Sequence, residues 1–352
     1  MEKNLFTSNF NKLPKGFIIA LILILLLELV NFTFDNYFYN PHMALLTGLQ
    51  FKIKNEIALS EENNFDLLIL GDSHSLNGFI PRVIEENTGL RSFNFALSGN
   101  QKLIGYYLIF KNYIKAHSTK PKYVVIGFVP YTTYPVTKSD YSKDAINHLA
   151  SLKNGNVREF IEEFGIVQGV KYIFPSLKHQ ARFKDFIKAP FSFNFLNKAQ
   201  INEVVKQIYD GKGYYPHPGE KRIYNSDRVN ERFMDEYNSF SIKDDVTNLT
   251  ISPFSYKYLK AILDLAKENN ITPIYYVPVF PPVIYDEFKK YVYFKELDEF
   301  LDSLKKEYPE LIVFYAQNIL NENNMYKDIY HLTSEGAVVL SEALSNKVNE
   351  IE

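Results

Sequence analysis

A short apolar run at residues 67–70 does most to constrain the fold of this chain. The run, Leu-Leu-Ile-Leu, contains no polar residue and predicts a strand that is buried on both faces. Such strands occur in parallel sheets that helices cover on both sides. The run ends in Gly71-Asp72-Ser73, so Ser73 is expected just beyond the carboxyl end of the strand, where open α/β sheets bind ligands.

The rest of the body alternates between strand and helix patterns, which predicts an α/β sandwich of three layers with about five parallel strands. The predicted strands are residues 65–70, 91–97, 123–129, 271–279 and 311–315, and the predicted helices are residues 81–87, 102–116, 254–268, 285–307 and 334–348. Thr333 is the expected N-cap of the last helix. The alternation stops at about residues 136–252, which predicts an insertion over the carboxyl end of the sheet, with helical pieces at residues 157–164 and 201–209.

The segment at residues 16–34 is strongly apolar. As a helix it would be roughly 28 Å long, close to the hydrocarbon thickness of a bilayer. Lysines lie only on its N-terminal side, which predicts a cytoplasmic tail at residues 1–15 and an extracytoplasmic body, in a periplasm or at a cell surface. A cleaved signal peptide is the alternative, but the flank lacks a small-x-small cleavage site. Residues 35–64 are then a juxtamembrane connector that is expected to be partly helical around residues 44–57, and residues 65–352 form the body.

Composition and motifs exclude several kinds of chemistry. The 352 residues include no cysteine, so disulfides and thiolate nucleophiles are excluded. The formal net charge of −2 argues against a nucleic-acid partner. There is no glycine-rich phosphate loop and no His-Glu-x-x-His motif, and we expect no cofactor. Metal-binding residue types do occur in two separate loops, which keeps a metal site as a weaker rival; they are Asp72, His74, Asp328 and His331.

A second polar motif precedes the last predicted helix. Asp328 lies three residues before His331, a spacing that lets one tight turn present both side chains to the same place. The carboxylate can fix the imidazole tautomer, and the imidazole can then accept a proton from a serine hydroxyl. The candidate catalytic residues are therefore Ser73, Asp328 and His331. Asp72 is expected to bond the backbone around Ser73, and His74 is expected to be structural, with a substrate contact as the alternative.

These motifs resemble those of the SGNH (GDSL-like) hydrolases. Gly71-Asp72-Ser73 is similar to the first block of that family, and Asp328-x-x-His331 is similar to the last. The resemblance implies a flavodoxin-like sandwich in which Ser73 is the nucleophile, Asp328 and His331 complete the triad, and Gly71 and Asp72 are structural. It covers short blocks within residues 65–134 and 253–348.

The family's second block supplies an oxyanion donor, and the stretch from Asn94 to Asn100 resembles it. The resemblance implies an oxyanion hole formed by the backbone N–H groups of Ser73 and Gly99, with the Asn100 side chain as a further donor. The third block, Gly-x-Asn, reads Gly127-Phe-Val here, so its usual asparagine is missing.

The anchor and the outward-facing body resemble a subset of this superfamily that includes teichoic-acid D-alanylation proteins of the DltD type and alginate O-acetylation proteins. This resemblance implies a serine-dependent acyl esterase or O-acyltransferase that acts on acylated glycans or polymers of the cell envelope. A membrane-bound O-acyltransferase is the implied partner. The sequence leaves the acyl group, the acceptor, and the choice between transfer and hydrolysis open. The alternative is a non-catalytic envelope assembly or glycan-binding protein that retains the SGNH fold.

Overall fold

The computed structural model describes residues 15–34, 46–97, 102–128, 166, 198–216, 226–239 and 253–352. The chain forms two compact units. The smaller unit comprises Met1–Ala44 and Lys153–Lys198, and the larger one comprises Leu45–Leu152 and Ala199–Glu352. The larger unit contains the sheet and the three candidate catalytic residues.

A five-stranded parallel sheet forms the centre of the larger unit. Its strands run in the order β2-β1-β3-β4-β5, which is the order of flavodoxin-like sheets. All five predicted strands are present, which confirms the α/β class. The strands are β1 (Leu67–Gly71), β2 (Ser92–Asn94), β3 (Tyr123–Gly127), β4 (Thr272–Val277) and β5 (Ile312–Tyr315).

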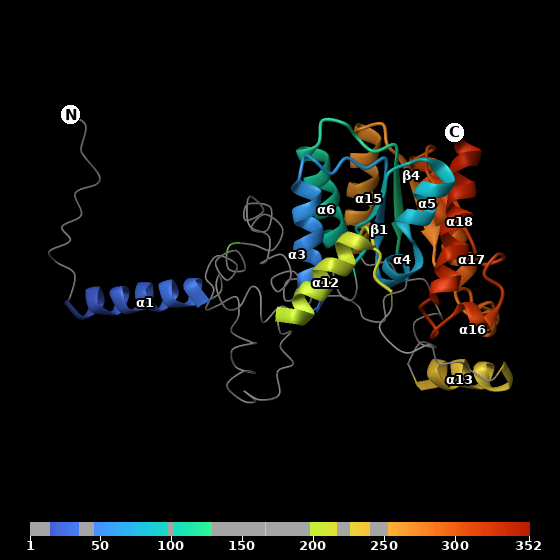
Figure 1. Cartoon of the computed structure of the whole chain (residues 1–352), viewed down its shortest axis with the longest axis horizontal. Helices are drawn as coiled ribbons and strands as arrows, with labels where there is room; N and C mark the ends of the chain where they lie inside the picture. Colours follow the sequence, from blue (N-terminus) through green and yellow to red (C-terminus); the bar gives the residue numbers. More distant parts are fainter. Residues whose placement is uncertain are drawn as a thin grey trace. The chain divides into compact units, whose positions relative to one another are not determined.

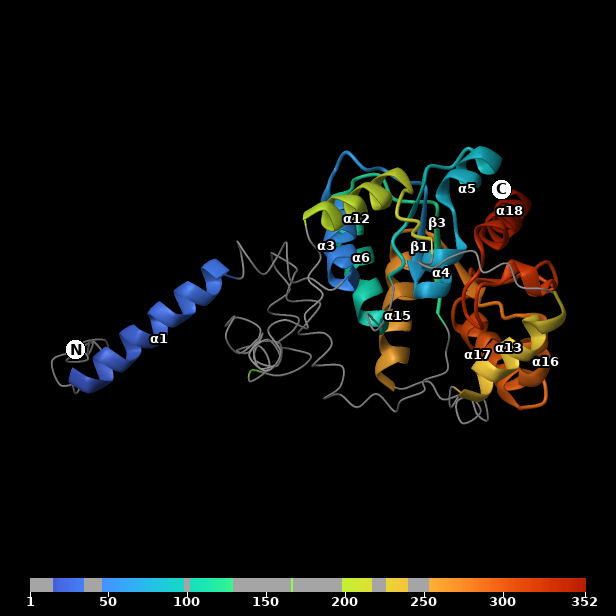
Figure 2. The ribbon, with the colours of Figure 1, turned by 60° about the horizontal axis from the view of Figure 1, so that its bottom comes forward.

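Helices lie on both sides of the strands in Figure 1 and Figure 2. On one side α5 (Pro81–Thr88) packs against α18 (Ser334–Ile351). On the other side α6 (Lys102–Ala116) packs against α15 (Pro253–Glu268). The helix α17 (Tyr293–Glu307) lies beside α15, where the rings of Tyr256 and Phe300 have their centroids 6.2 Å apart. The apolar faces of these helices cover a sheet whose β1 and β3 residues are all buried.

One predicted helix is two helices. The spacing predicts a single helix over residues 285–307, but the structure has α16 (Pro282–Phe288) and α17, separated by a turn. Phe288 and Tyr293 are both almost fully buried. Residues five positions apart point about 140° away from each other on a continuous helix. The break therefore allows both rings to enter the same aromatic cluster, where Phe288 also contacts Phe280 with centroids 4.8 Å apart.

The larger unit begins before residue 65. The helix α3 (Leu46–Leu59) falls within the predicted connector, yet it packs against α6. Its side chains Phe51 and Ala58 have no exposed surface. Burial of apolar side chains on this scale stabilises a folded domain, and a loose connector would not provide it. The folded body thus includes α3.

The N-terminal helix α1 covers Lys15–Phe34 in the smaller unit. Across the residues whose placement is described, none of the helices was found to have both the length and the apolarity that crossing a membrane requires. The structure therefore does not support the transmembrane anchor predicted for residues 16–34, and the anchor stays a prediction.

Two described helices come from the insertion. The helix α12 (Lys198–Asp210) corresponds to the helical piece predicted at residues 201–209. The helix α13 (Ser226–Ser239) was not predicted. The other predicted piece, residues 157–164, lies outside the described residues.

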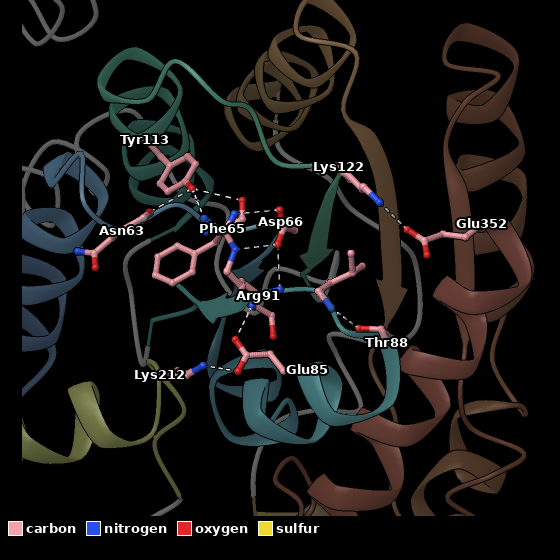
Figure 3. A network of polar contacts seen from close by, with 12 residues as sticks. Asn63, Phe65, Asp66, Glu85, Thr88, Arg91, Tyr113, Lys122, Lys212 and Glu352 are labelled. Atoms are coloured by element: carbon pink, nitrogen blue, oxygen red, sulfur yellow. Dashed lines mark hydrogen bonds and ion pairs between the residues drawn. The ribbon is translucent and has the colours of Figure 1, made fainter.

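Polar contacts connect the amino-terminal ends of the first three strands, as Figure 3 shows. Asp66, just before β1, accepts hydrogen bonds on Oδ2 from the backbone N–H and from Nε of Arg91, both at 3.0 Å. The Asp66 carbonyl also accepts from the backbone N–H groups of Lys122 at 2.8 Å and Tyr123 at 3.1 Å. This edge of the sheet is thus closed by structural contacts. The opposite edge, at the carboxyl ends of the strands, carries the candidate site.

Candidate active site

Ser73 is the first residue of a short helix, α4 (Ser73–Gly78), which begins directly after β1. The Asp72 side chain caps this helix, because its Oδ1 accepts the His74 backbone N–H at 2.9 Å. The Asp72 backbone N–H in turn donates to the Gly127 carbonyl of β3 at 3.1 Å. These contacts hold Ser73 at the carboxyl edge of the sheet.

Two glycines allow this helix to start so close to the sheet. Gly71 and Gly127 are partners in the register of β1 and β3. A Cβ atom on Gly71 would lie 2.2 Å from the Gly127 carbonyl oxygen, and one on Gly127 would lie 1.9 Å from Ser75 Oγ. Ser75 of α4 is fully buried against these two glycines, and its hydroxyl donates to the Gly127 carbonyl at 3.4 Å. Larger residues at either glycine would push α4 away from the strand ends.

Ser73, His331 and Asp328 lie in one hydrogen-bonded line. His331 Nε2 is 2.9 Å from Ser73 Oγ. On the other side of the ring, His331 Nδ1 is 2.8 Å from Asp328 Oδ2 and 3.0 Å from Asp328 Oδ1. The side chains of His331 and Asp328 are only 15% and 16% exposed. The structure thus brings the three sequence-predicted residues together in the geometry of a serine hydrolase triad.

The turn that carries Asp328 also keeps it ionised. Its Oδ1 accepts the backbone N–H groups of Tyr330 and His331, both at 2.8 Å. Burial raises the pKa of the Asp328 carboxyl, but the hydrogen bond and charge of His331 and these backbone donors outweigh it and lower the pKa to about 2. A carboxylate only accepts hydrogen bonds, so His331 Nδ1 must donate. The neutral imidazole then presents the lone pair of Nε2 to the Ser73 hydroxyl.

A second Asp-His pair lies next to the triad. His74 Nδ1 is 3.1 Å from Asp72 Oδ1, and the His74 ring lies 5.9 Å from the His331 ring, centroid to centroid. The rings of Phe280 and Tyr330 meet it edge-on at 6.0 Å and 5.8 Å. His74 is 8% exposed, and within the described part of the chain its Nε2 is buried without a hydrogen-bond partner. His74 therefore packs beside His331. Among the described contacts, His74 forms no hydrogen bond with Ser73 Oγ.

Asn94, at the end of β2, fixes the helix that carries Ser73. It has no exposed surface. Its Nδ2 donates to the carbonyls of Ser75 at 2.8 Å and Phe79 at 2.9 Å, and its Oδ1 accepts the Ala96 backbone N–H at 3.0 Å. The sequence signal for this role is an asparagine between Phe93 and Phe95 in an apolar strand, because a buried amide needs partners for both of its ends.

A segment of the insertion also packs on α4. Asn77 donates through Nδ2 to the Tyr215 carbonyl, and the Tyr215 backbone N–H donates to the Leu76 carbonyl at 3.4 Å. Lys54 of α3 connects this segment to the chain beyond β2, because its Nζ donates to the Gly213 carbonyl at 2.8 Å and the Ala96 carbonyl at 2.6 Å. Burial lowers the pKa of the Lys54 amine well below its usual value.

Two of the predicted oxyanion residues, Gly99 and Asn100, lie outside the described residues, as does Val129 of the third block. Only Ser73, the remaining predicted donor, is placed, at the start of α4. Among the residues that the structure does describe, no group of three or more acidic or histidine side chains is arranged to hold a metal ion.

Comparisons with known proteins found no match to this chain, either among protein-family models or among curated proteins. The assignment of function therefore depends on the residues and geometry described above.

Proposed function

We propose that this protein is a serine-dependent acyl esterase or O-acyltransferase of the SGNH type. The observation that carries the proposal is the 2.9 Å contact between His331 Nε2 and Ser73 Oγ, with His331 Nδ1 held by an ionised Asp328. Two chain segments far apart in sequence supply a nucleophile, a base and an orienting carboxylate in the order that acyl transfer needs. The same arrangement is the reason to prefer an enzyme over a non-catalytic envelope or glycan-binding protein.

The proposed reaction has two halves. Ser73 Oγ attacks the carbonyl carbon of an ester while His331 Nε2 accepts the hydroxyl proton, and Asp328 stabilises the imidazolium that forms. We assign the tetrahedral oxyanion to the backbone N–H of Ser73, together with the donors that the family resemblance implies, the Gly99 N–H with or without the Asn100 amide. The bond to the leaving alkoxide then breaks, His331 returns the proton to that alkoxide, and the acyl group stays on Ser73.

In the second half, an acceptor hydroxyl attacks the acyl-Ser73 carbonyl while His331 removes its proton. The intermediate collapses, and His331 returns that proton to Ser73 Oγ. If the acceptor is a glycan hydroxyl the reaction is a transfer, and if it is water the reaction is a hydrolysis. We propose an acylated glycan or polymer of the cell envelope as substrate, without a metal or cofactor. Exclusion of water by the insertion would favour transfer.

We further propose that residues 16–34 hold the protein in the membrane with its body outside, beside a membrane-bound O-acyltransferase. The support is the apolar sequence of this segment and the lysines that flank it on its N-terminal side alone. Resistance of the full-length chain to extraction by alkaline carbonate would support the anchor, and its release into the supernatant would refute it.

The catalytic proposal is tested by labelling the full-length chain in detergent with a fluorophosphonate, which reacts with activated serines. The expected result is a single modified residue, Ser73, with labelling abolished in Ser73→Ala. Because the base contributes on the order of 100-fold or more to such reactions, His331→Gln is expected to slow labelling by at least that factor. Ser75→Ala is the matched control, since Ser75 is a buried serine on the same helix whose hydroxyl bonds the Gly127 carbonyl, and this variant should still be labelled at Ser73. Absence of labelling in a folded wild-type chain would favour the non-catalytic alternative.

A further inference from the structure

Lys54 is a fully buried lysine that the proposed reaction does not use. It lies in α3 and has no exposed surface. Its Nζ donates hydrogen bonds to two backbone carbonyls, that of Ala96 at 2.6 Å and that of Gly213 at 2.8 Å. A lysine amine has only donors to offer, and its burial is costly unless acceptors meet it. Because the two carbonyls belong to different segments, this side chain joins the chain after β2 to the insertion.

The chain after β2 runs beside the strand that leads to the nucleophile. The Phe95 backbone N–H donates to the Ile69 carbonyl at 2.7 Å, and the Leu97 backbone N–H donates to the Gly71 carbonyl at 2.9 Å. The hydrogen bonds to β1 thus continue beyond the end of β2. Gly71 is two residues before Ser73, so this extension lies next to the backbone that leads into the nucleophile.

The outer side of this extension has no neighbouring strand, because β2 is at the edge of the sheet. Alternate residues of an edge strand direct their backbone N–H and carbonyl away from the sheet, where they need other partners. Ala96 lies between two residues that bond β1, so its own polar groups point outward. Asn94 Oδ1 accepts the Ala96 N–H at 3.0 Å, and Lys54 Nζ donates to the Ala96 carbonyl. The lysine thus takes the place of a further strand at this carbonyl.

The insertion covers the same edge. The Asn94 backbone N–H donates to the Lys212 carbonyl at 2.9 Å. Gly213 follows with a φ of +85°, and a Cβ atom on it would lie 2.0 Å from the Asn94 carbonyl oxygen, so the close approach requires glycine. The Tyr215 backbone N–H then donates to the Leu76 carbonyl of α4 at 3.4 Å. The segment that the lysine holds therefore continues onto the helix that carries the nucleophile.

We propose that Lys54 is a positioning residue of the candidate active site, which fixes the chain after β2 and the insertion segment beside the strand and helix that present Ser73. This role rests on the proposed function, because it belongs to the same site. In that function the Gly99 N–H is an oxyanion donor, and Gly99 follows Ala96 by three residues in the sequence. A small displacement of a preorganised donor or of the nucleophile weakens transition-state stabilisation even when the protein stays folded.

The first test measures how fast a fluorophosphonate labels Ser73 in the full-length chain in detergent. Lys54→Met has a similar length but no donor, and we expect it to slow labelling by about 10-fold or more. Asn55→Ala is the matched control, because Asn55 is a buried residue of the same helix whose Oδ1 accepts a hydrogen bond from Asn112 of α6 at 2.8 Å. It should keep a rate close to that of wild type. Equal slowing in both variants would mean that any loosening of α3 has this effect, and it would overturn the proposal.

Chemical rescue separates the amine from the shape of the side chain. The chain has no cysteine, so Lys54→Cys introduces a single thiol. Alkylating this thiol with 2-bromoethylamine in urea, and then returning the chain to detergent without urea, places an amine as many bonds from the backbone as in lysine. We expect this product to recover most of the labelling rate of wild type taken through the same steps. Alkylation with bromoethane, which adds no amine, should leave labelling slow, and equal rates after the two alkylations would contradict a role for the amine.

Amide hydrogen exchange of the same proteins tests the contact itself. The peptide that covers residues 93–97 contains the N–H groups that bond β1, and Lys54→Met should make it exchange about 10-fold faster. Peptides from β3 and β4 should keep the wild-type rate, as should the 93–97 peptide in Asn55→Ala. Unchanged exchange of this peptide in Lys54→Met would show that the lysine does not hold this part of the chain.

Failure of this role and failure of the proposed function give different results. A folded wild-type chain that the fluorophosphonate does not label would refute the proposed function. The exchange of residues 93–97 does not depend on whether Ser73 reacts, so it would still decide whether Lys54 fixes the chain after β2.

Discussion

His331 Nε2 lies 2.9 Å from Ser73 Oγ, although the two residues are 258 positions apart in the chain. Ser73 is held at the end of β1, and His331 is held by the turn before α18. Thr333 caps that helix, since its Oγ1 accepts the Gly336 backbone N–H at 3.1 Å, which confirms the predicted N-cap. The site therefore joins the first strand of the body to its last helix, and its integrity depends on the packing between them.

The lowered pKa of Asp328 links the triad to the pH dependence of stability. Its folded pKa of about 2 lies below the model-peptide value of 3.8, so the carboxylate stabilises the fold above about pH 4, and this contribution is lost as the pH falls through 2. The contribution at pH 7 is about 2 kcal/mol. In urea unfolding of the full-length chain, Asp328→Asn should have a lower free energy of unfolding than wild type. This difference should be smaller by about 1 kcal/mol at pH 3 than at pH 7. A deficit that does not change with pH would show that the carboxylate is not stabilised in this way.

The close approach of Gly127 to Ser75 predicts a strong and specific packing effect. Gly127→Ala places a methyl group 1.9 Å from Ser75 Oγ, and overpacking of this kind costs about 1–3 kcal/mol or more. Ser75→Gly removes the clashing side chain and should restore part of the loss, although Tyr276 Cδ1 at 3.0 Å still limits the space. A double-mutant cycle of thermal unfolding measures the coupling. Additive effects would mean that α4 does not sit against the strand ends as described.

Asn94 is expected to matter for both stability and reactivity. Asn94→Ala leaves the carbonyls of Ser75 and Phe79 and the N–H of Ala96 buried without this partner, at a cost of about 2–4 kcal/mol. Because α4 then loses the hydrogen bonds that Asn94 donates from β2, labelling of Ser73 should also slow. Asn87→Ala is the matched control, since Asn87 donates to the Val83 carbonyl on an exposed surface and should change stability by less than about 0.5 kcal/mol. Equal effects of the two substitutions would contradict the role assigned to Asn94.

Lys54 predicts a pH dependence of stability on the alkaline side. Burial lowers its folded pKa, so between that pKa and about 10.5 the unfolded chain binds a proton that the folded chain does not. Stability due to this residue therefore increases as the pH rises through that window. Lys54→Met, which has a similar length and no titratable group, should remove the increase. The check is the free energy of urea unfolding of wild type and Lys54→Met at pH 7 and at pH 9.5. An equal change between the two pH values in both proteins would argue that Lys54 stays protonated in the folded chain.

Local sequence pattern was enough to predict the elements whose stabilising interactions lie within a few residues of each other. The apolar run before Gly71 predicts β1, because a strand that is buried on both faces has apolar side chains at every position. The three-residue spacing of Asp328 and His331 predicts their contact, because one turn is enough to bring them together. Thr333 predicts the start of α18, because a capping hydroxyl acts within three residues.

Contacts between residues far apart in the chain could not be predicted from local pattern and are seen only in the folded protein. That Ser73 lies within hydrogen-bond reach of His331 depends on the order of the strands and on the packing of α18 against α4. The hydrogen bonds of Asn94 and Lys54 likewise join segments that are far apart in the sequence, and nothing in either local pattern indicates the other segment. A helix such as α13 is marginal alone and is stabilised mainly by the surface that its apolar face meets. The physical reason is the same in each case. Periodicity and capping act over a few residues, whereas burial and buried hydrogen bonds depend on which distant segments pack together in the folded chain.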